Sequence, residues 1–240
     1  MGLFPVRSLE LKNGNREALL VLTGIGYGFS GMRSMKKFRK QAPDLDLFVP
    51  DYIQNSGIDD SVRFLESYYN RNDLHRYDRV HLFCFIAGAY VLERWMDQIP
   101  NAGRLLLDRS PYQERAPSIV TRRIPWVARL LLGDFVFQLA AREYPQKPLS
   151  RFKPGLVIES RPTTLMKLFS RDCKKMGPLK WPAREMQDEF ADFQYVPFNH
   201  DSIYSNFHTL AQSIRAFLQS GNFGEIYRNP PGTTDEASHT

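Results

Sequence analysis

The stretch Val80-His-Leu-Phe-Cys-Phe-Ile-Ala-Gly-Ala89 decides how the rest of this sequence is interpreted. Residues 78–84 predict a strand, and residues 89–98 predict a helix. The small side chains from Ala87 to Ala89 permit a sharp turn between the two. The stretch therefore predicts a strand, a tight turn and a helix, which is a unit of an α/β sheet.

Similar units extend on both sides of this stretch. Further strands are predicted at 18–23, 45–50, 103–108, 154–159 and 194–197. Further helices are predicted at 32–42, 56–69, 164–174 and 202–219. Residues 8–12 alternate like a strand, and Asn13-Gly14-Asn15 is a hairpin signal. Because strands and helices alternate from 18 to 108, we expect an α/β fold with a mostly parallel, doubly wound sheet.

The alternation breaks at Arg109. Two or three short helices are predicted after it, separated by Pro125 and Gly133. We therefore expect a core formed by residues 1–108 and 152–222, with residues 109–151 inserted as a helical cap. Residues 223–240 are rich in Pro, Gly, Asp and Thr and are expected to be disordered.

The composition limits the classes of function. The formal net charge is +6 and the pI is about 9.3, so the surface can attract phosphates. The basic residues are dispersed and no binding module is present, so nucleic acid is not expected as a partner. Cys84 and Cys173 form neither a disulfide framework nor a metal motif, and no metal or cofactor is expected. No signal peptide or membrane span is evident, which predicts a soluble, cytoplasmic protein; peripheral contact with an anionic membrane stays open.

A second motif follows the first buried strand. Gly24-Ile25-Gly26-Tyr27-Gly28 is a glycine-rich turn, which suits a tight turn or a close approach of the backbone to a ligand. It lacks the Gly-Lys-Ser/Thr ending of a phosphate-binding loop.

Together, the glycine-rich turn and the stretch at 80–89 resemble the α/β-hydrolase superfamily. The resemblance implies that the turn supplies an oxyanion-hole N–H and that 80–89 is the nucleophile elbow, Gly-x-Ser-x-Gly. Aligning Gly88 with the second glycine places Cys84 at the first glycine and Ile86 at the serine. Ile86 cannot attack a carbonyl, and a β-branched residue fits poorly at a strained apex. Cys84 is expected to lie within the strand as a small buried residue.

The resemblance also locates a histidine and an acid. His200, after the last strand, matches the catalytic histidine, although it can instead be a structural residue bonded to Asp201. The usual position of the acid falls near Pro162, which cannot serve, and Glu159 comes too early. Asp108 ends an earlier strand and forms a candidate pair with His200; the alternative is that Asp108 caps the turn into 109–111. His208 is expected to pack or face solvent.

Three functions remain open. The first is a non-catalytic protein, a pseudoenzyme, that binds a small apolar or acyl ligand, or a protein partner, at a pocket beneath the cap. Its expected pocket and oxyanion-turn residues are Gly24, Ile25, Gly26, Tyr27, Phe85, Ile86, Ala87 and Trp126. The second is an esterase-like or lyase-type enzyme that uses His200 and Asp108 without a serine. The third is a peripheral membrane or scaffold protein that binds through its basic face.

Overall fold

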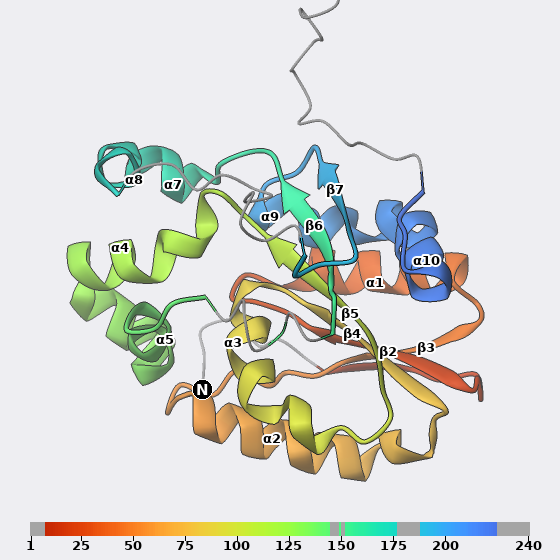
Figure 1. Cartoon of the computed structure of the whole chain (residues 1–240). Helices are drawn as coiled ribbons and strands as arrows, with labels where there is room; N and C mark the ends of the chain where they lie inside the picture. Colours follow the sequence, from red (N-terminus) through yellow and green to blue (C-terminus); the bar gives the residue numbers. More distant parts are fainter. Residues whose placement is uncertain (1–7, 145–148, 150–151, 177–187, 225–240) are drawn as a thin grey trace, which may run out of the picture.

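A computed structural model of the chain describes residues 8–144, 149, 152–176 and 188–224. It contains one seven-stranded sheet in the order β1-β3-β2-β4-β5-β6-β7 (Figure 1). The strands are β1 Leu9–Leu11, β2 Glu17–Leu22, β3 Leu45–Val49, β4 Arg79–Cys84, β5 Ala102–Arg109, β6 Gly155–Glu159 and β7 Asp192–Val196. All neighbouring strands pair in parallel except β1, which runs antiparallel to β3. The expected mostly parallel, doubly wound sheet is confirmed.

The edge strand β1 corrects one prediction. The hairpin signal at 13–15 predicts that β1 pairs with β2, the next strand along the chain. Instead β1 pairs with β3, with Leu9 opposite Val49. Both edges of β2 are already occupied by β3 and β4, so only the free edge of β3 remains for β1.

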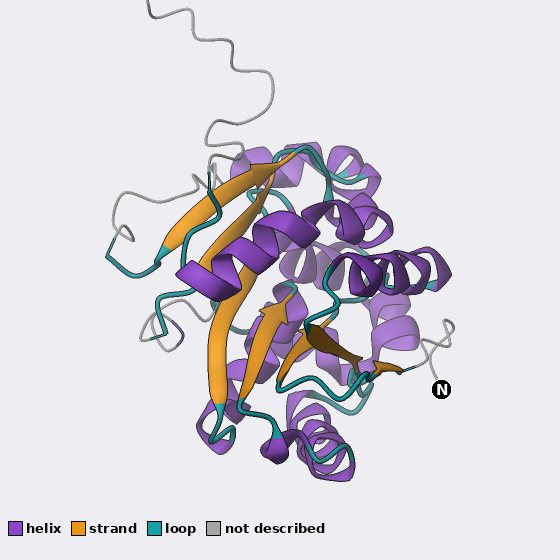
Figure 2. Ribbon diagram, turned by 90° about the vertical axis from the view of Figure 1, so that its right-hand side faces the viewer, coloured by secondary structure: helices purple, strands orange, loops and turns teal. Residues whose placement is uncertain are grey.

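Helices cover both faces of the sheet (Figure 2). On one face lie α1 Phe29–Gln41, α9 His200–Asn206 and α10 Ala211–Ser220, and on the other lie α2 Ile58–Arg71 and α3 Ile86–Trp95. Alternate residues of one strand pack into the two layers: Leu19 and Val21 face the α1 side, whereas Leu20 faces the α2 side. Because both faces are buried, the central strands are mostly apolar, and charged residues such as Asp108 and Glu159 stand near their ends.

The segment after β5 leaves the sheet as helices. These are α4 Ala116–Arg123 and α5 Pro125–Ala140, and after β6 come α7 Thr164–Leu168 and α8 Ser170–Lys175. The predicted helix boundary at Gly133 is a kink inside α5, where Gly133 has φ 60°. Figure 1 shows α4, α5, α7 and α8 along one side of the molecule, beyond the ends of the central strands. The predicted tail lies mostly outside the described residues. Across the described ranges, no helix has the length and apolar character that a membrane span requires.

A buried ion pair fixes the exit from β5. The Nε of Arg109 donates to Glu114 Oε1 at 2.7 Å and Nη2 donates to Oε2 at 3.0 Å. The Arg109 guanidinium also lies 3.8 Å from the centre of the Tyr144 ring. Ser110 N donates to Glu114 at 3.1 Å, and the Ser110 hydroxyl accepts from the next turn. Glu114 and Ser110, and not Asp108, therefore cap the turn into 109–111.

We predict that Glu114→Ala lowers the free energy of unfolding by about 3–5 kcal/mol, because it leaves the buried Arg109 charge without its carboxylate. Arg63→Ala, which breaks the exposed ion pair with Asp60, is the matched control and is expected to lose about 1 kcal/mol at most. Urea unfolding followed by circular dichroism measures both. Equal losses in the two variants would contradict the prediction.

Candidate functional site

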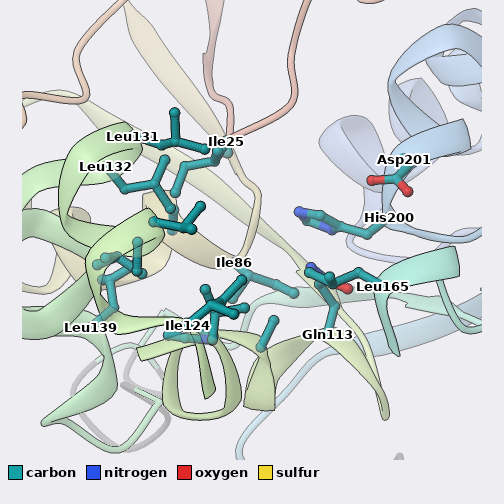
Figure 3. Close-up of a pocket in the computed structure, with 18 residues that line it drawn as sticks. Ile25, Ile86, Gln113, Ile124, Leu131, Leu132, Leu139, Leu165, His200 and Asp201 are labelled. Atoms are coloured by element: carbon teal, nitrogen blue, oxygen red, sulfur yellow. The ribbon is translucent and has the colours of Figure 1, made fainter. Parts of the chain in front are cut away.

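A cavity of about 360 Å³ lies where the carboxyl ends of β2 and β4 meet α4 and α5 (Figure 3). This is the edge at which parallel α/β sheets bind ligands. The residues that line it are Gly24, Ile25, Ile86, Ala87, Gln113, Ala116, Pro117, Val120, Ile124, Val127, Ala128, Leu131, Leu132, Val136, Leu139, Leu165, His200 and Asp201. Most of this lining is aliphatic, and the size suits a small ligand.

The polar groups of the lining are few. His200, Asp201 and Gln113 bring side-chain polar groups to the wall, on the side away from Leu131, Leu132 and Leu139 of α5 (Figure 3). A cavity of this kind fits an apolar chain with one polar end.

The turn between β4 and α3 has the outline of a nucleophile elbow without its strain. β4 ends at Cys84 and α3 begins directly at Ile86. In the described residues, the only non-glycine positions with positive φ are Asp73 and Lys153, so Ile86 has ordinary backbone geometry. The strained apex expected at Ile86 is therefore wrong. α3 begins three residues earlier than predicted, so Ile86 is the first residue of a helix. A β-branched side chain is tolerated in that backbone conformation.

Two neighbours of Ile86 explain the close packing here. A Cβ on Gly88 would lie 2.6 Å from the backbone oxygen of Leu22, so only glycine lets α3 approach β2 this closely. Cys84 is fully buried at the end of β4, and burial raises the pKa of its thiol far above the ordinary value. The Cys84 thiol is thus held in its protonated, unreactive form.

His200 is positioned by the start of α9. Asn199 caps this helix reciprocally with Ser202, which fixes the first turn. The imidazole Nδ1 lies 2.8 Å from Glu159 Oε1 and 3.3 Å from Asp108 Oδ2. Both carboxylates are fully buried at the ends of adjacent strands. The exposed Asp201 side chain is not among the hydrogen-bond partners of His200.

Glu159 is the residue that sequence reasoning placed too early. Glu159 and His200 form the hydrogen bond, whereas neither oxygen of Asp108 forms one within the described part of the chain. Asp108 is nevertheless in ionic contact with His200, so both acids hold the same nitrogen. The signal that could have identified Glu159 is its position at the end of β6, paired beside β5 in parallel.

The charges of this group depend on one another. Burial by itself lowers the pKa of His200, but the carboxylates of Glu159 and Asp108 outweigh this effect and raise it to about 10. Burial and the charge of Asp108 raise the pKa of Glu159 to about 8, against the opposing effect of His200. The two carboxyl groups therefore favour the imidazolium form of His200, in which Nδ1 donates to Glu159.

Tyr204 closes the other side of His200. Its hydroxyl accepts from the backbone N–H of Gly24 at 2.9 Å and lies 3.3 Å from His200 Nε2. The Tyr204 side chain is buried and stacks at 4.4 Å on Phe85. The hydroxyl thus occupies the space between the glycine-rich turn and the histidine. The sequence analysis missed Tyr204, although its i, i+4 spacing from His200 on a helix was a usable signal.

The predicted pocket residues separate into two groups. Gly24, Ile25, Ile86 and Ala87 line the cavity, and Gly26, Tyr27, Phe85 and Trp126 are not among its lining residues. Tyr27 and Phe85 pack into the core on the α1 side, and Trp126 faces solvent. His208 Nδ1 lies 2.9 Å from the Ser34 hydroxyl, away from the cavity.

One group of described side chains has the spacing of metal ligands. The ligand atoms of Asp108, Glu159 and His200 lie within 4.8 Å of one another. The same His200 Nδ1 is engaged by Glu159, so a metal ion would have to displace that hydrogen bond and enter a fully buried space.

Comparisons with known proteins identify the fold. No protein-family model matches the sequence, and no curated protein matches it. Among solved structures, an α/β-hydrolase enzyme from the metagenome of lagoon sediments at Mar Chica, Morocco, has a TM-score of 0.55 at 14% identity, over 88% of this chain and 94% of that one. A mature lipase from Bacillus licheniformis has a TM-score of 0.55 at 12% identity, over 87% of this chain and 93% of the lipase. The enzyme 1H-3-hydroxy-4-oxoquinoline 2,4-dioxygenase has a TM-score of 0.56 at 13% identity, over 88% of this chain and 95% of the dioxygenase. The chain has the α/β-hydrolase fold.

We predict that the free energy of unfolding falls as pH rises from about 5 to about 9. The pKa of His200 rises on folding from 6.5 to about 10. The contribution of His200 to the free energy of unfolding is therefore complete below pH 6.5 and is lost as the pH rises from there to about 10. The pKa of Glu159 rises from 4.5 to about 8, which removes further stability as pH rises through that range.

Each pKa unit corresponds to about 1.4 kcal/mol, so urea unfolding at several pH values resolves the slope. In Glu159→Gln the slope is expected to be smaller, because one titrating group is gone and His200 keeps an acceptor. His75→Gln changes an exposed histidine and serves as the control. A wild-type slope equal to that of Glu159→Gln would refute the linkage.

Proposed function

We propose that this chain binds a small apolar or acyl ligand in the cavity beneath α4 and α5 and does not turn it over. In this proposal residues 109–151 act as a cap over the cavity. The observation that carries it is which residues stand at the positions where a serine hydrolase of this fold has its nucleophile and its free histidine nitrogen. Ile86 takes the place of the nucleophile, and the Tyr204 hydroxyl occupies the space beside His200 Nε2.

The protonation state of His200 supports the same proposal. A general base must accept a proton near the working pH. With a pKa of about 10, the His200 imidazole already carries its second proton at neutral pH. It is better suited to attract a carbonyl or carboxylate at the polar end of a ligand through its positive charge.

The cavity supports the chemical class of the ligand. Leu131 and Leu132 of α5 form an aliphatic wall, and His200 is part of the opposite side (Figure 3). Val127 of the same helix also lines the cavity. An acyl chain would pack against the wall with its carbonyl toward His200. The fold neighbours are named as enzymes, but their likeness at 12–14% identity extends to the fold alone.

A second candidate is an enzyme of this fold that uses His200 directly on a substrate, without a covalent step. The contact of His200 with Asp108 and Glu159 favours it, because a histidine held by carboxylates at Nδ1 is the arrangement of a base or acid. For turnover, the Tyr204 hydroxyl would have to leave Nε2. This candidate includes ester or acyl substrates.

We predict that Val127→Trp weakens binding of a fluorescent medium-chain fatty acid by more than about tenfold, because the larger side chain fills the cavity. Leu130→Trp is the matched control: it adds a ring three residues later on the same helix, where the side chain is 72% exposed. Its affinity is expected to stay within about twofold of wild type, less than 0.5 kcal/mol. Fluorescence titration gives both constants. Absence of binding, or equal affinities in the two variants, would contradict a ligand in this cavity.

We predict that purified protein shows no ester turnover that depends on His200. Short- and medium-chain acyl esters are assayed with wild type, His200→Ala and Tyr204→Phe, and the folding of each variant is checked by circular dichroism. Equal background rates are expected throughout, because no serine, threonine or cysteine is among the described residues that line the cavity. Turnover that disappears in His200→Ala, or rises in Tyr204→Phe, would establish the second candidate instead.

A further inference from the structure

The outer surface of α5 carries apolar side chains that nothing in the described chain covers. Trp126 is 73% exposed and Leu130 is 72% exposed, and they lie four residues apart, on one side of the helix. On α7, Leu168 is 75% exposed. Isolated exposed leucines are ordinary, but Trp126 and Leu130 form an apolar pair on α5, and Leu168 lies two residues before α8, which is paired with the end of α4.

The first half of α5 is apolar on both sides. Val127, Ala128 and Leu131 face the cavity, while Trp126 and Leu130 face away from it. Arg129 is the one charged side chain in this half, exposed and paired with Asp134, and a helix that is apolar on two sides is most stable where both are covered. Here the inner side is covered by the cavity walls, so the outer side is expected to meet an apolar environment as well.

The positive charge of the chain is concentrated in the stretch of sequence that contains α4, α5, α7 and α8. Residues 116–176 contain twelve Lys or Arg and four Asp or Glu, a formal net charge of +8, so the rest of the chain sums to −2. On α7 and α8 the exposed basic residues are Lys167, Arg171, Lys174 and Lys175. This arrangement complements an anionic surface.

Ion pairs join α8 to the end of α4. Arg122 and Arg123, at the end of α4, both bind the single carboxylate of Asp172 on α8, at 3.1 and 2.6 Å. This contact brings α8 beside the end of α4, and Arg123 is three residues before Trp126. Two cations share one carboxylate here, so a positive charge remains near the apolar pair.

We propose that this face, defined as Trp126, Leu130 and Leu168 with Lys167, Arg171, Lys174 and Lys175, docks on the surface of a membrane that contains anionic lipids. Trp and Leu insert at the boundary of headgroups and acyl chains, and the lysine and arginine side chains reach the phosphates. Nucleic acid fits less well, because its phosphate backbone gives Leu130 and Leu168 no apolar surface to cover. The proposal does not depend on the ligand of the cavity.

The test is co-sedimentation of the full chain with phosphatidylcholine vesicles, with and without phosphatidylserine. Binding is expected only with phosphatidylserine and is expected to weaken as salt rises. Lys174→Glu/Lys175→Glu is expected to weaken it by more than about tenfold, because each basic residue near an anionic surface contributes about 1 kcal/mol. Lys36→Glu/Lys37→Glu makes the same change of charge on α1 and is expected to change binding by about twofold at most.

The apolar contribution is tested by Trp126→Ala/Leu130→Ala. Both side chains are exposed, so the fold is expected to persist, and binding to the anionic vesicles is expected to fall. Binding that is absent, insensitive to salt, or weakened equally by the two charge variants would overturn the proposal. So would size-exclusion chromatography that shows a dimer dissociated by Trp126→Ala/Leu130→Ala without vesicle binding, because the face would then join two copies of the chain.

Discussion

Two carboxylates, Asp108 and Glu159, are buried side by side at the ends of β5 and β6, and the charge on His200 is what makes this tolerable. An isolated ionised carboxyl in such a place would be strongly unfavourable, and two would repel each other. The imidazole Nδ1 contacts both acids, and their charges raise the pKa of His200. This contact ties the start of α9 to the sheet.

Tyr204 links His200 to the glycine-rich turn. Its hydroxyl joins the far nitrogen of His200 to the backbone of Gly24, so β5, β6, α9 and the glycine-rich turn form one hydrogen-bonded unit. In a serine hydrolase the corresponding space must stay free for the nucleophile and the oxyanion. Here it is filled by a hydroxyl of the chain itself, beside an aliphatic Ile86. Gly24 and His200 therefore form part of one wall of the cavity, and aliphatic side chains of α4 and α5 form much of the remaining lining.

α5 has apolar side chains on two sides, and the two sides have different surroundings. The inner side lines a cavity of about 360 Å³, and the outer side shows Trp126 and Leu130 to solvent. Residues 116–176, which include α4 and α5, also hold an excess of positive charge, and this is the basis of the proposed anionic interface.

The sequence by itself determined the order of the elements and the parallel sheet, because fully buried strands must be mostly apolar along their length. It also placed Ile86 directly after a central strand and His200 after the last strand, since both follow from position in the chain. Only the tertiary structure decided the pairing of β1 with β3, the choice of Glu159 as the hydrogen-bonded acid and the contact of Tyr204 with Gly24, 180 residues away. These depend on which strand edge remains free and on how α9 packs against the sheet. Local pattern contains no information on such distant partners, because periodicity reports the face a residue occupies and not the side chain it meets there.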